Sequence, residues 1–435
     1  MFGVDEMNSA GLTIKTVAER TGVSVHTLRA WERRYGVPSP HRGQANRYRL
    51  YDEHDIADVL YLRHQVESGI APAQASALLR QNQTKSTKVI ATEGTQPIAS
   101  LQSALLEALA KSDETTARHT IDEAFALLPP EQVALAIIEP TMRAIGKRWM
   151  RNEMTVWQEH LASNLIQQKL FVVLQSQPLL PSSAPTIAAA CAPAEDHQLG
   201  LVIFALLARR QGWRVEYLGQ GTPLADIADL ARTSRPTAII VSVSTVIGMA
   251  GLIPWIDSTN RPSVPLVFGG IMLNRVPSLR EHLPGEYLGG DTLAAVRQLA
   301  AVKMRADYWS PSRRARQAVE LLQSQRLKIA GETVVAMMNT IGAKNHRTWD
   351  ATNLNFATLF LIDTLACALA FGAPDLIDEQ REWLRNAMPP RSVAPQLIDQ
   401  HLKIFERALH KTLTKDRARL FAPLIERMQN QTNDS

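Results

Sequence analysis

Cysteine is scarce in this chain of 435 residues, which contains two. A disulfide framework is therefore excluded, and the composition suits a reducing compartment such as the cytoplasm. Cys191 lies within a strand-like apolar run, and Cys367 lies on the apolar face of a helical segment. We expect both to be buried thiols with structural roles, because apolar surroundings are typical of unreactive cysteines.

Long apolar stretches and a secretory signal are also missing. No run approaches the roughly 18 apolar residues that span a membrane, and the N-terminus has no signal-peptide pattern. The net charge of +5 is modest, so affinity for nucleic acid must come from a local basic patch. We therefore expect a cytoplasmic protein with no membrane partner. Its length predicts several domains, because single cores rarely exceed about 250–300 residues.

Composition and periodicity divide the chain into four folded units and one linker. A helical module with a basic middle, 1–81, is followed by a polar stretch, 82–97, that lacks apolar periodicity. Helix-period spacing at 98–178 predicts a bundle. Strand and helix patterns alternate at 185–306, and the last unit, 311–430, is again helical.

The N-terminal module has the pattern of a DNA-binding unit. A helix-period segment, Thr13–Thr21, is followed by Gly22, and Ser24 is a good N-cap for a second helix over Val25–Tyr35. This order predicts a helix-turn-helix, whose second helix enters the major groove. A basic, glycine-containing stretch then predicts a β-wing on phosphates. The residues expected to contact DNA are Ser24, His26, Thr27, Arg29, Arg42, Arg47, Tyr48 and Arg49.

This module resembles the winged-helix domain of MerR-family regulators, which bind pseudo-palindromic DNA as dimers. The resemblance covers about residues 13–81 and rests on TVAERTGVSVHTLRAWERRYG and NRYRLYDEHDI. It implies a double-stranded DNA operator as partner, with single basic residues contacting mainly phosphates. The alternative is a solvated arginine face with no role in DNA binding. Trp31 and Arg34 stay open, because either could pack inside the module.

Short strand-like runs and helical segments alternate between 185 and 306. Such alternation predicts a parallel sheet with right-handed crossovers, in which ligands bind beyond the carboxyl ends of the strands. The expected strands are Thr186–Ala192, Arg214–Leu218, Ala238–Ser244, Pro265–Phe268 and Glu286–Leu288.

Three motifs coincide with the ends of these strands. EDHQLG at 195–200 follows the first strand, SVS at 242–244 ends the third, and GG at 269–270 ends the fourth. A histidine on a strand-to-helix loop can reach from the sheet edge to an axial metal position. Small residues leave room for a ligand beside the sheet, and glycine permits close backbone approach.

This ExHxxG, SxS and GG series resembles the cobalamin-binding domain of methionine synthase, the mutases and the CarH-type light-responsive repressors. The resemblance implies that His197 is the lower axial ligand of cobalt, with its second ring nitrogen oriented by Glu195 or Asp196. It also implies a slot for the dimethylbenzimidazole tail. The residues expected to bind cobalamin here are Glu195, Asp196, His197, Gly200, Ser242, Ser244, Thr245, Gly269 and Gly270.

A tryptophan in the bundle, Trp149, precedes Glu159 and His160 with nine residues between. This W-x9-EH pattern resembles the cap over adenosylcobalamin in CarH-type photoreceptors, where the tryptophan packs on the adenosyl group. It favours adenosylcobalamin over methylcobalamin as the cofactor. In some of those proteins a histidine follows the tryptophan and captures cobalt after photolysis, whereas this chain has Met150, a weak, soft ligand. The alternative is a core aromatic with a solvated Glu-His pair.

The helical unit at 311–430 has no counterpart in a typical CarH-type chain. Residues 359–376, Trp383 and RSVAPQL at 391–397 resemble the globin-like extension of photocobilins, which pair cobalamin with a bilin. The resemblance implies biliverdin as a second cofactor. A helical oligomerisation or partner domain is the alternative. The nominal propionate partners are His346, Arg347, Arg381 and Arg391.

The expected function is a light-responsive, cobalamin-dependent transcriptional regulator, a repressor in the favoured form and not an enzyme. Photolysis would change a homo-oligomer, dimer or tetramer, and with it DNA avidity. The alternatives are a light-independent cobalamin sensor and a cobalamin-dependent methyltransferase component, although no barrel-sized catalytic module is present. The expected fold class is multidomain α and α/β. It comprises a winged helix-turn-helix, a four-helix-type bundle, a Rossmann-like (flavodoxin-like) parallel-sheet domain and an all-α C-terminal domain.

Overall fold

The computed structural model describes residues 13–42, 49–51, 53–67, 71–74, 76, 96–257, 261–341, 350–388, 390 and 393–429. The chain divides into two compact units, Met1–Ala99 and Ser100–Ser435. The predictions made for Arg47, Tyr48, His346, Arg347 and Arg391, and for most of the 82–97 linker, lie outside the described residues.

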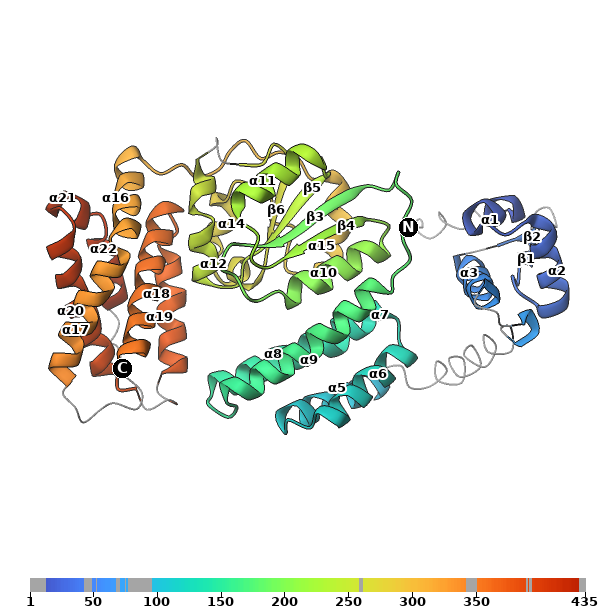
Figure 1. Ribbon diagram of the computed structural model, residues 1–435, viewed down its shortest axis with the longest axis horizontal. Coiled ribbons are helices and arrows are strands. Elements are labelled where there is room, and N and C mark those ends of the chain that lie inside the picture. The colour runs from blue at the N-terminus through green and yellow to red at the C-terminus, as the bar shows by residue number, and fades with distance from the viewer. Residues whose placement is uncertain are drawn as a thin grey trace, which may run out of the picture. The chain divides into compact units, whose positions relative to one another are not determined.

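The first unit is a small winged helix-turn-helix (Figure 1). Thr13 caps α1 (Ile14–Thr21), and Gly22, with φ of 67°, makes the left-handed turn before α2 (Val25–Tyr35). The wing strands β1 (His41–Arg42) and β2 (Arg49–Leu50) pair antiparallel, and α3 (Glu53–Glu67) follows them. Trp31 is buried in the core of this unit, whereas Arg34 is exposed, which settles the two positions that the sequence left open.

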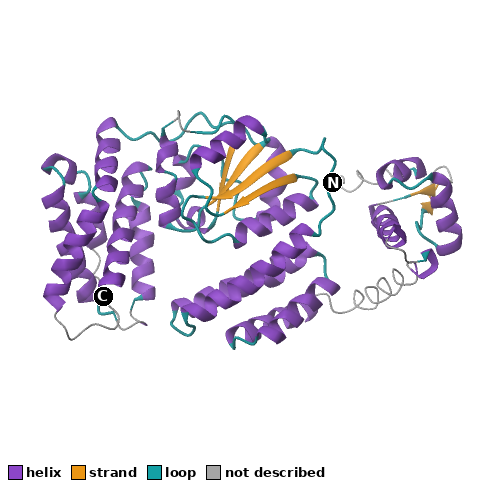
Figure 2. Ribbon diagram, viewed as in Figure 1, coloured by secondary structure: helices purple, strands orange, loops and turns teal. Residues whose placement is uncertain are grey.

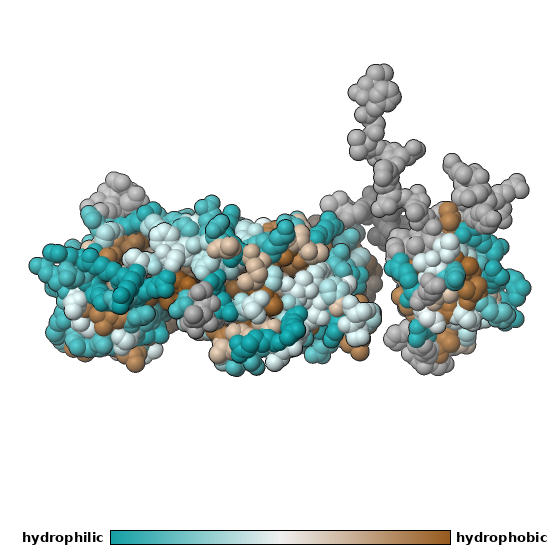
Figure 3. All heavy atoms as spheres, turned by 90° about the horizontal axis from the view of Figure 1, so that it is seen from above, coloured by the Kyte–Doolittle hydropathy of each residue, from teal (hydrophilic) through white to brown (hydrophobic). Residues whose placement is uncertain are grey.

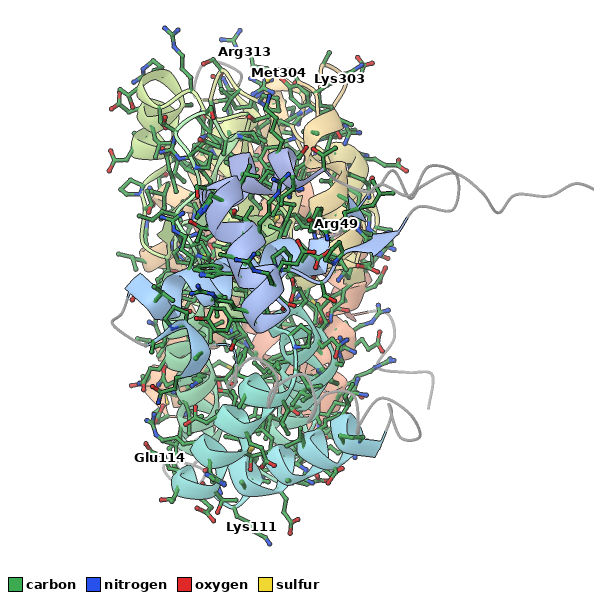
Figure 4. All side chains as sticks on the ribbon, turned by 90° about the vertical axis from the view of Figure 1, so that its right-hand side faces the viewer. Arg49, Lys111, Glu114, Lys303, Met304 and Arg313 are labelled. Atoms are coloured by element: carbon green, nitrogen blue, oxygen red, sulfur yellow. The ribbon has the colours of Figure 1, made fainter. Side chains whose placement is uncertain are left out.

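A helical bundle precedes the sheet of the second unit (Figure 2). Asp113 caps α6, and Thr155 and Gln158 form a capping box at the start of α9. Figure 4 shows Lys111 and Glu114 at the turn between α5 and α6. The elements are α5 (Gln96–Ala110), α6 (Glu114–Leu127), α7 (Pro130–Gln132), the π-helix η1 (Val133–Ile138), α8 (Glu139–Met150) and α9 (Val156–Gln175).

A parallel four-stranded sheet follows, in the order β4-β3-β5-β6. This is a flavodoxin-like order. β4 is added on one side of β3 and the next strand, β5, on the other, so the strand order reverses between β3 and β5, where such folds bind ligands. Its strands are β3 (Thr186–Cys191), β4 (Arg214–Gly219), β5 (Ala238–Ser242) and β6 (Leu266–Gly269). Its helical segments are α10 (Leu199–Arg210), α11 (Leu224–Thr233), α12 (Val246–Gly251), η2 (Ile253–Ile256), α13 (Ile271–Arg275), α14 (Ser278–His282), α15 (Thr292–Gln298) and η4 (Leu299–Ala301).

Two strand predictions need correction. The prediction of a strand at Glu286–Leu288 is wrong, because this segment makes an isolated bridge between Glu286 and Val267 and no ladder. The expected third strand ends at Ser242 rather than Ser244, so Ser244 lies in the loop beyond the sheet. The first segment has three residues and lies beside the outer strand β6, whereas the second differs only in where its strand ends, which apolar patterning defines poorly.

The C-terminal domain is helical, as expected. One apolar core runs without interruption from the sheet domain, through Val246 and Met249, to Leu365 of α18 and to Phe371, the C-cap of that helix. Figure 3 shows a surface in which hydrophilic residues predominate and apolar patches are separate. The elements are α16 (Arg313–Ser324), α17 (Arg326–Ile341), α18 (Ala351–Ala370), α19 (Asp375–Ala387), α20 (Pro395–Thr412), α21 (Lys415–Ala418) and α22 (Ala422–Gln429).

Helix α18 corrects the expectation that no apolar run approaches membrane length. By length and composition it is the one candidate span among the described helices, with a mean hydropathy of 1.5 over its most apolar window. However, 61% of that window is buried inside the protein, and Asp363 within it pairs with Arg326 at 3.0 Å. The central helix of a folded domain passes the same test, because it is apolar on all its faces.

Candidate cobalamin and DNA sites

Glu195 is a buried carboxylate at the carboxyl edge of the sheet, with 1% of its surface exposed. Its Oε1 accepts hydrogen bonds from the backbone N of His197 at 3.0 Å and from the ring Nδ1 at 2.7 Å. Its Oε2 accepts from the backbone N of Ser244 and of Thr245, both at 2.7 Å, and from Thr245 Oγ1 at 2.9 Å. One carboxylate therefore ties the loop after β3 to the loop after β5, across the switch point of the sheet.

His197 projects from this anchor, and its side chain is 68% exposed. A carboxylate can only accept, so Nδ1 carries the proton and Nε2 presents its lone pair outward. The hydrogen bond to Glu195 raises the pKa of His197. Burial acts to raise the pKa of Glu195, but its hydrogen bonds lower that pKa overall. Asp196 is exposed, and the carboxylate that contacts the imidazole ring is Glu195.

Small residues surround this pair for different physical reasons. A Cβ on Gly269 would meet no atom within 4 Å, so the backbone there borders open space. Gly270 has φ of 107°, and a Cβ on it would lie 2.1 Å from the carbonyl oxygen of Val243. Ser242 is buried at the end of β5, and a Cβ on Gly200 would also meet no atom within 4 Å.

These features fit a cobalamin. The exposed imidazole of His197 would hold the metal of such a group, whose own ring would supply further nitrogen ligands. The open side of Gly269 leaves room for a bulky group beside the sheet. Within the described residues, no group of three or more His, Cys, Asp or Glu could hold a metal ion by itself. A single axial histidine is therefore what this edge of the sheet presents to a metal.

The helical bundle contributes Glu159 and His160 from the first turns of α9. Glu159 accepts a hydrogen bond from Ser163 Oγ at 2.6 Å, and its Oε2 lies 3.7 Å from Nε2 of the exposed His160. The negative charge of Glu159 also acts to raise the pKa of His197, so this carboxylate lies within electrostatic reach of the imidazole. Trp149 is half-buried at the end of α8.

Sequence reasoning missed the residues that hold the bundle to the sheet domain. Gln198 donates from Nε2 to Gln167 Oε1 at 3.2 Å and accepts from Tyr217 OH at 3.1 Å. Phe171 of α9 packs edge-on against Tyr217 with ring centroids 5.5 Å apart. Gln198 occupies a variable position of the ExHxxG motif, so the only available signal was its place beside His197.

In the first unit, the predicted DNA-contacting residues divide into capping and exposed groups. Ser24 Oγ accepts from the backbone N of Thr27 at 3.0 Å, and the two hydroxyls are 2.8 Å apart, so this pair caps α2. His26 and Arg29 are exposed on α2 and are available to a partner. Arg42 lies on β1 of the wing.

Glu32 is a second residue that sequence reasoning missed. It lies 3.4 Å from Arg49 Nε of the wing and accepts from Tyr51 OH at 3.3 Å, which joins β2 to α2. Burial and the charge of Glu32 raise the pKa of Tyr51 to about 12. Figure 4 shows Arg49 on the ribbon of this unit. The wing is therefore fixed to the recognition helix through one carboxylate.

Comparison with known proteins adds to this geometry. Residues 12–82 match the MerR HTH family regulatory protein model, and residues 101–174 and 185–297 match two B12 binding domain models. The HTH-type transcriptional repressor CarH of Myxococcus xanthus is 34% identical over 238 residues, which are 54% of this chain and 78% of that protein. The repressor CarA of the same organism is 28% identical over 296 residues, 67% of this chain and 96% of that one.

Among solved structures, the monomethylamine corrinoid protein of Methanosarcina barkeri is similar over 45% of this chain and 96% of its own length. The sequence identity is 15% and the TM-score is 0.39, values too low to bear on function.

The fold and these matches define a MerR-type transcriptional regulator that binds DNA and cobalamin. The expectation of a regulator rather than an enzyme is confirmed by the curated relatives, which are both repressors. The chain belongs to the family of the transcriptional repressor CarH.

Proposed function

We propose that this protein is a cytoplasmic, light-responsive repressor that uses adenosylcobalamin as its sensor. The observation that carries the proposal is the pairing of His197 with buried Glu195, which fixes the imidazole ring at the switch point of the sheet through its Nδ1. A ligand held from below by that nitrogen would lie opposite the bundle residues Trp149, Glu159 and His160. The relatives named CarH and CarA are repressors, which supports the sign of regulation.

The residues of the chain have separate roles in this proposal. His197 binds cobalt from below, and Glu195 keeps the proton on Nδ1 so that Nε2 stays available. Ser242, Ser244, Gly269 and Gly270 border the slot for the nucleotide tail. Bound adenosylcobalamin supplies a cobalt–carbon bond that light can break, while the protein supplies orientation and readout.

The readout is proposed to run through the bundle. Trp149 would pack on the adenosyl group and stabilise one arrangement of α8 and α9 against the sheet domain. Without that contact, α8 and α9 would no longer be held in this arrangement, and the dimer–tetramer equilibrium and the avidity for the operator would change. Linked DNA-binding units gain affinity strongly from being joined, so a modest shift in assembly changes operator occupancy.

A bilin remains the second ligand in this proposal, for the C-terminal domain. Its support is the resemblance of residues 359–376 to photocobilins and a buried polar layer inside the domain. In that layer His401 lies 2.8 Å from Thr358 Oγ1. Arg381, the described member of the four cationic candidates, lies 3.2 Å from Asp378 and donates to the backbone oxygen of Arg427. Reconstitution with biliverdin should give a far-red absorption band, and its absence would leave an oligomerisation domain.

The decisive experiment compares the full-length chain and His197→Ala after reconstitution with adenosylcobalamin in darkness. We expect the wild-type spectrum to show an imidazole-ligated corrinoid that changes under green light, and His197→Ala to lack that signature. Retention of a promoter fragment should fall after illumination. Equal retention in darkness and light would favour the light-independent cobalamin sensor, and corrinoid-dependent methyl transfer would favour the methyltransferase component.

A further inference from the structure

The C-terminal domain is attached to the two loops that border the proposed cobalt site. The thiol of Cys367 on α18 lies 3.8 Å from the carbonyl oxygen of Val246, the residue directly after Thr245. Glu379 on α19 lies 3.1 Å from Nη1 of Arg275 on α13, the helix that begins directly after Gly270. Helix α18 therefore contacts α12, which follows the SVS motif, and α19 contacts α13, which follows the GG motif.

A third contact joins the same domain to the bundle. Asn152, two residues beyond Met150, donates from Nδ2 to the carbonyl oxygen of Pro390 at 3.1 Å. Pro390 follows the end of α19. Sheet domain, bundle and C-terminal domain thus meet around one region, and Figure 1 shows α18 and α19 on the side of the C-terminal domain that is nearer to the sheet.

An aromatic row lies on these two helices. The rings of Phe356 and Phe360 on α18 are stacked, with centroids 6.5 Å apart and an interplanar angle of 24°. Trp383 on α19 continues the row at 5.9 Å from Phe360. Phe356 is 60% exposed, although an aromatic side chain gains much free energy from burial. We name Phe356, Phe360 and Trp383 the aromatic row.

Helical geometry aligns this row with the docked face of α18. Phe356, Phe360 and Cys367 are separated by four and seven residues, a spacing that places all three on one side of an α-helix. Cys367 is fully buried against α12, whereas Phe356 is open. The face of α18 that packs on the sheet domain at Cys367 therefore continues, uncovered, toward the N-terminal end of this helix at Phe356.

Elements of the sheet domain and of the bundle carry exposed apolar side chains as well. Ile271, directly after Gly270, is 43% exposed, and Val156, one helical turn before His160, is 55% exposed. Exposed apolar groups on each of the elements around one region are typical of a ligand site whose ligand is partly apolar.

We propose that the aromatic row is a third wall of the cobalamin site and packs against the periphery of the bound cofactor. This inference rests on the proposed placement of cobalt above His197. The C-terminal domain then contacts the ligand itself and responds directly to whether cobalamin is present. The aromatic row adds apolar contact area without adding a ligand to cobalt.

The test uses the full-length chain loaded with hydroxocobalamin or with adenosylcobalamin in darkness. Phe356→Ala should release either form about tenfold faster than wild type, the change expected when one well-placed aromatic contact is lost. Val335→Ala on α17 is the matched control, because Val335 is similarly exposed at 62% and lies on a helix farther from the sheet domain. Its release rate should equal that of wild type.

Hydrogen exchange gives a second readout that does not depend on a variant. Cobalamin binding should slow amide exchange in the first half of α18, around residues 351–360, and leave α17 unchanged. Suppose that the chain retains cobalamin with its imidazole signature, but Phe356→Ala and the α18 amides are unaffected. In that case the proposal that the aromatic row contacts the cofactor is wrong, while the proposed function stands. A chain that retains no corrinoid overturns both.

Discussion

Gly248 lies directly against Glu195: a Cβ on Gly248 would be 2.7 Å from Oε2 of that carboxylate. The first turn of α12 therefore has to lack a side chain at this position for Glu195 to reach Thr245 and His197 at the same time. The sequence motifs predicted a role for His197, whereas the lack of a side chain at Gly248 is what allows its partner Glu195 to occupy this position.

Gly248→Ala should weaken cobalamin retention by about tenfold or more, because the added methyl group displaces the carboxylate that orients His197. Retention can be measured from the absorption spectrum of the protein after gel filtration in darkness. Gly331→Ala is a suitable control, since a Cβ there meets no atom within 4 Å and α17 should gain up to about 1 kcal/mol of stability. Unchanged retention in Gly248→Ala would show that Glu195 does not position the ligand.

Met150→His should change the state reached after illumination. A thioether is a weak ligand, whereas an imidazole at the same place can bind cobalt from above. We expect the variant to give a stable light-induced spectrum with two histidine ligands, and the wild-type chain to give a different one. Spectra recorded in darkness should be the same for both. Identical spectra after light would place this position out of reach of the cobalt.

His401 predicts a pH dependence of the C-terminal domain. Burial lowers its pKa from 6.5 to about 4, so the unfolded chain binds a proton in this interval that the folded chain does not. The free energy of unfolding should therefore have its full value above pH 6.5. It should fall as the pH drops toward 4, at about 1.4 kcal/mol per pH unit at most. Urea unfolding at pH 7.5 and 5.5 measures this difference in the free energy of unfolding.

His401→Gln is the matched variant, because it keeps a donor toward Thr358 but has no titration in this range. We expect it to lower stability at neutral pH and to flatten the difference between the two pH values. An equal pH dependence in wild type and variant would assign the effect to other groups.

Arg29→Ala should weaken binding to a promoter fragment that the wild-type chain retains. Arg29 is exposed on the recognition helix, and loss of one phosphate contact should reduce the slope of log affinity against log salt by about 1. Lys111→Ala in the bundle is the control, because Lys111 is a similarly exposed cation outside the DNA-binding unit. An unchanged affinity and slope for Arg29→Ala would remove this residue from the interface.

Much of the fold follows from local rules that a sequence displays. Ser24, Gly22 and the apolar spacing of α2 predict the helix-turn-helix, and near-continuous apolar runs predict the four paired strands. The expected fifth strand failed at Glu286, where three residues at the sheet margin make only a bridge. The burial of Cys191 and Cys367 is confirmed.

The candidate site was only partly predictable, because its decisive contacts join distant positions. Glu195 and Thr245 are 50 residues apart, and nothing in the sequence distinguishes Glu195 from Asp196 as the partner of His197. The same holds for Glu32, which joins α2 to the wing through Arg49 and Tyr51. Phe356 reads as a core residue of an apolar helix until the fold shows that its side of α18 is uncovered.

The apolar core shared by the sheet domain and α18 has a consequence for how the chain can be divided. Removing everything after residue 306 would leave Val246, Met249 and Trp255 without the helix that now shields them from water. Such a truncated chain would be unstable and prone to aggregation, so a shortened regulator made from this protein must either keep the last helices or replace the newly exposed side chains with polar ones.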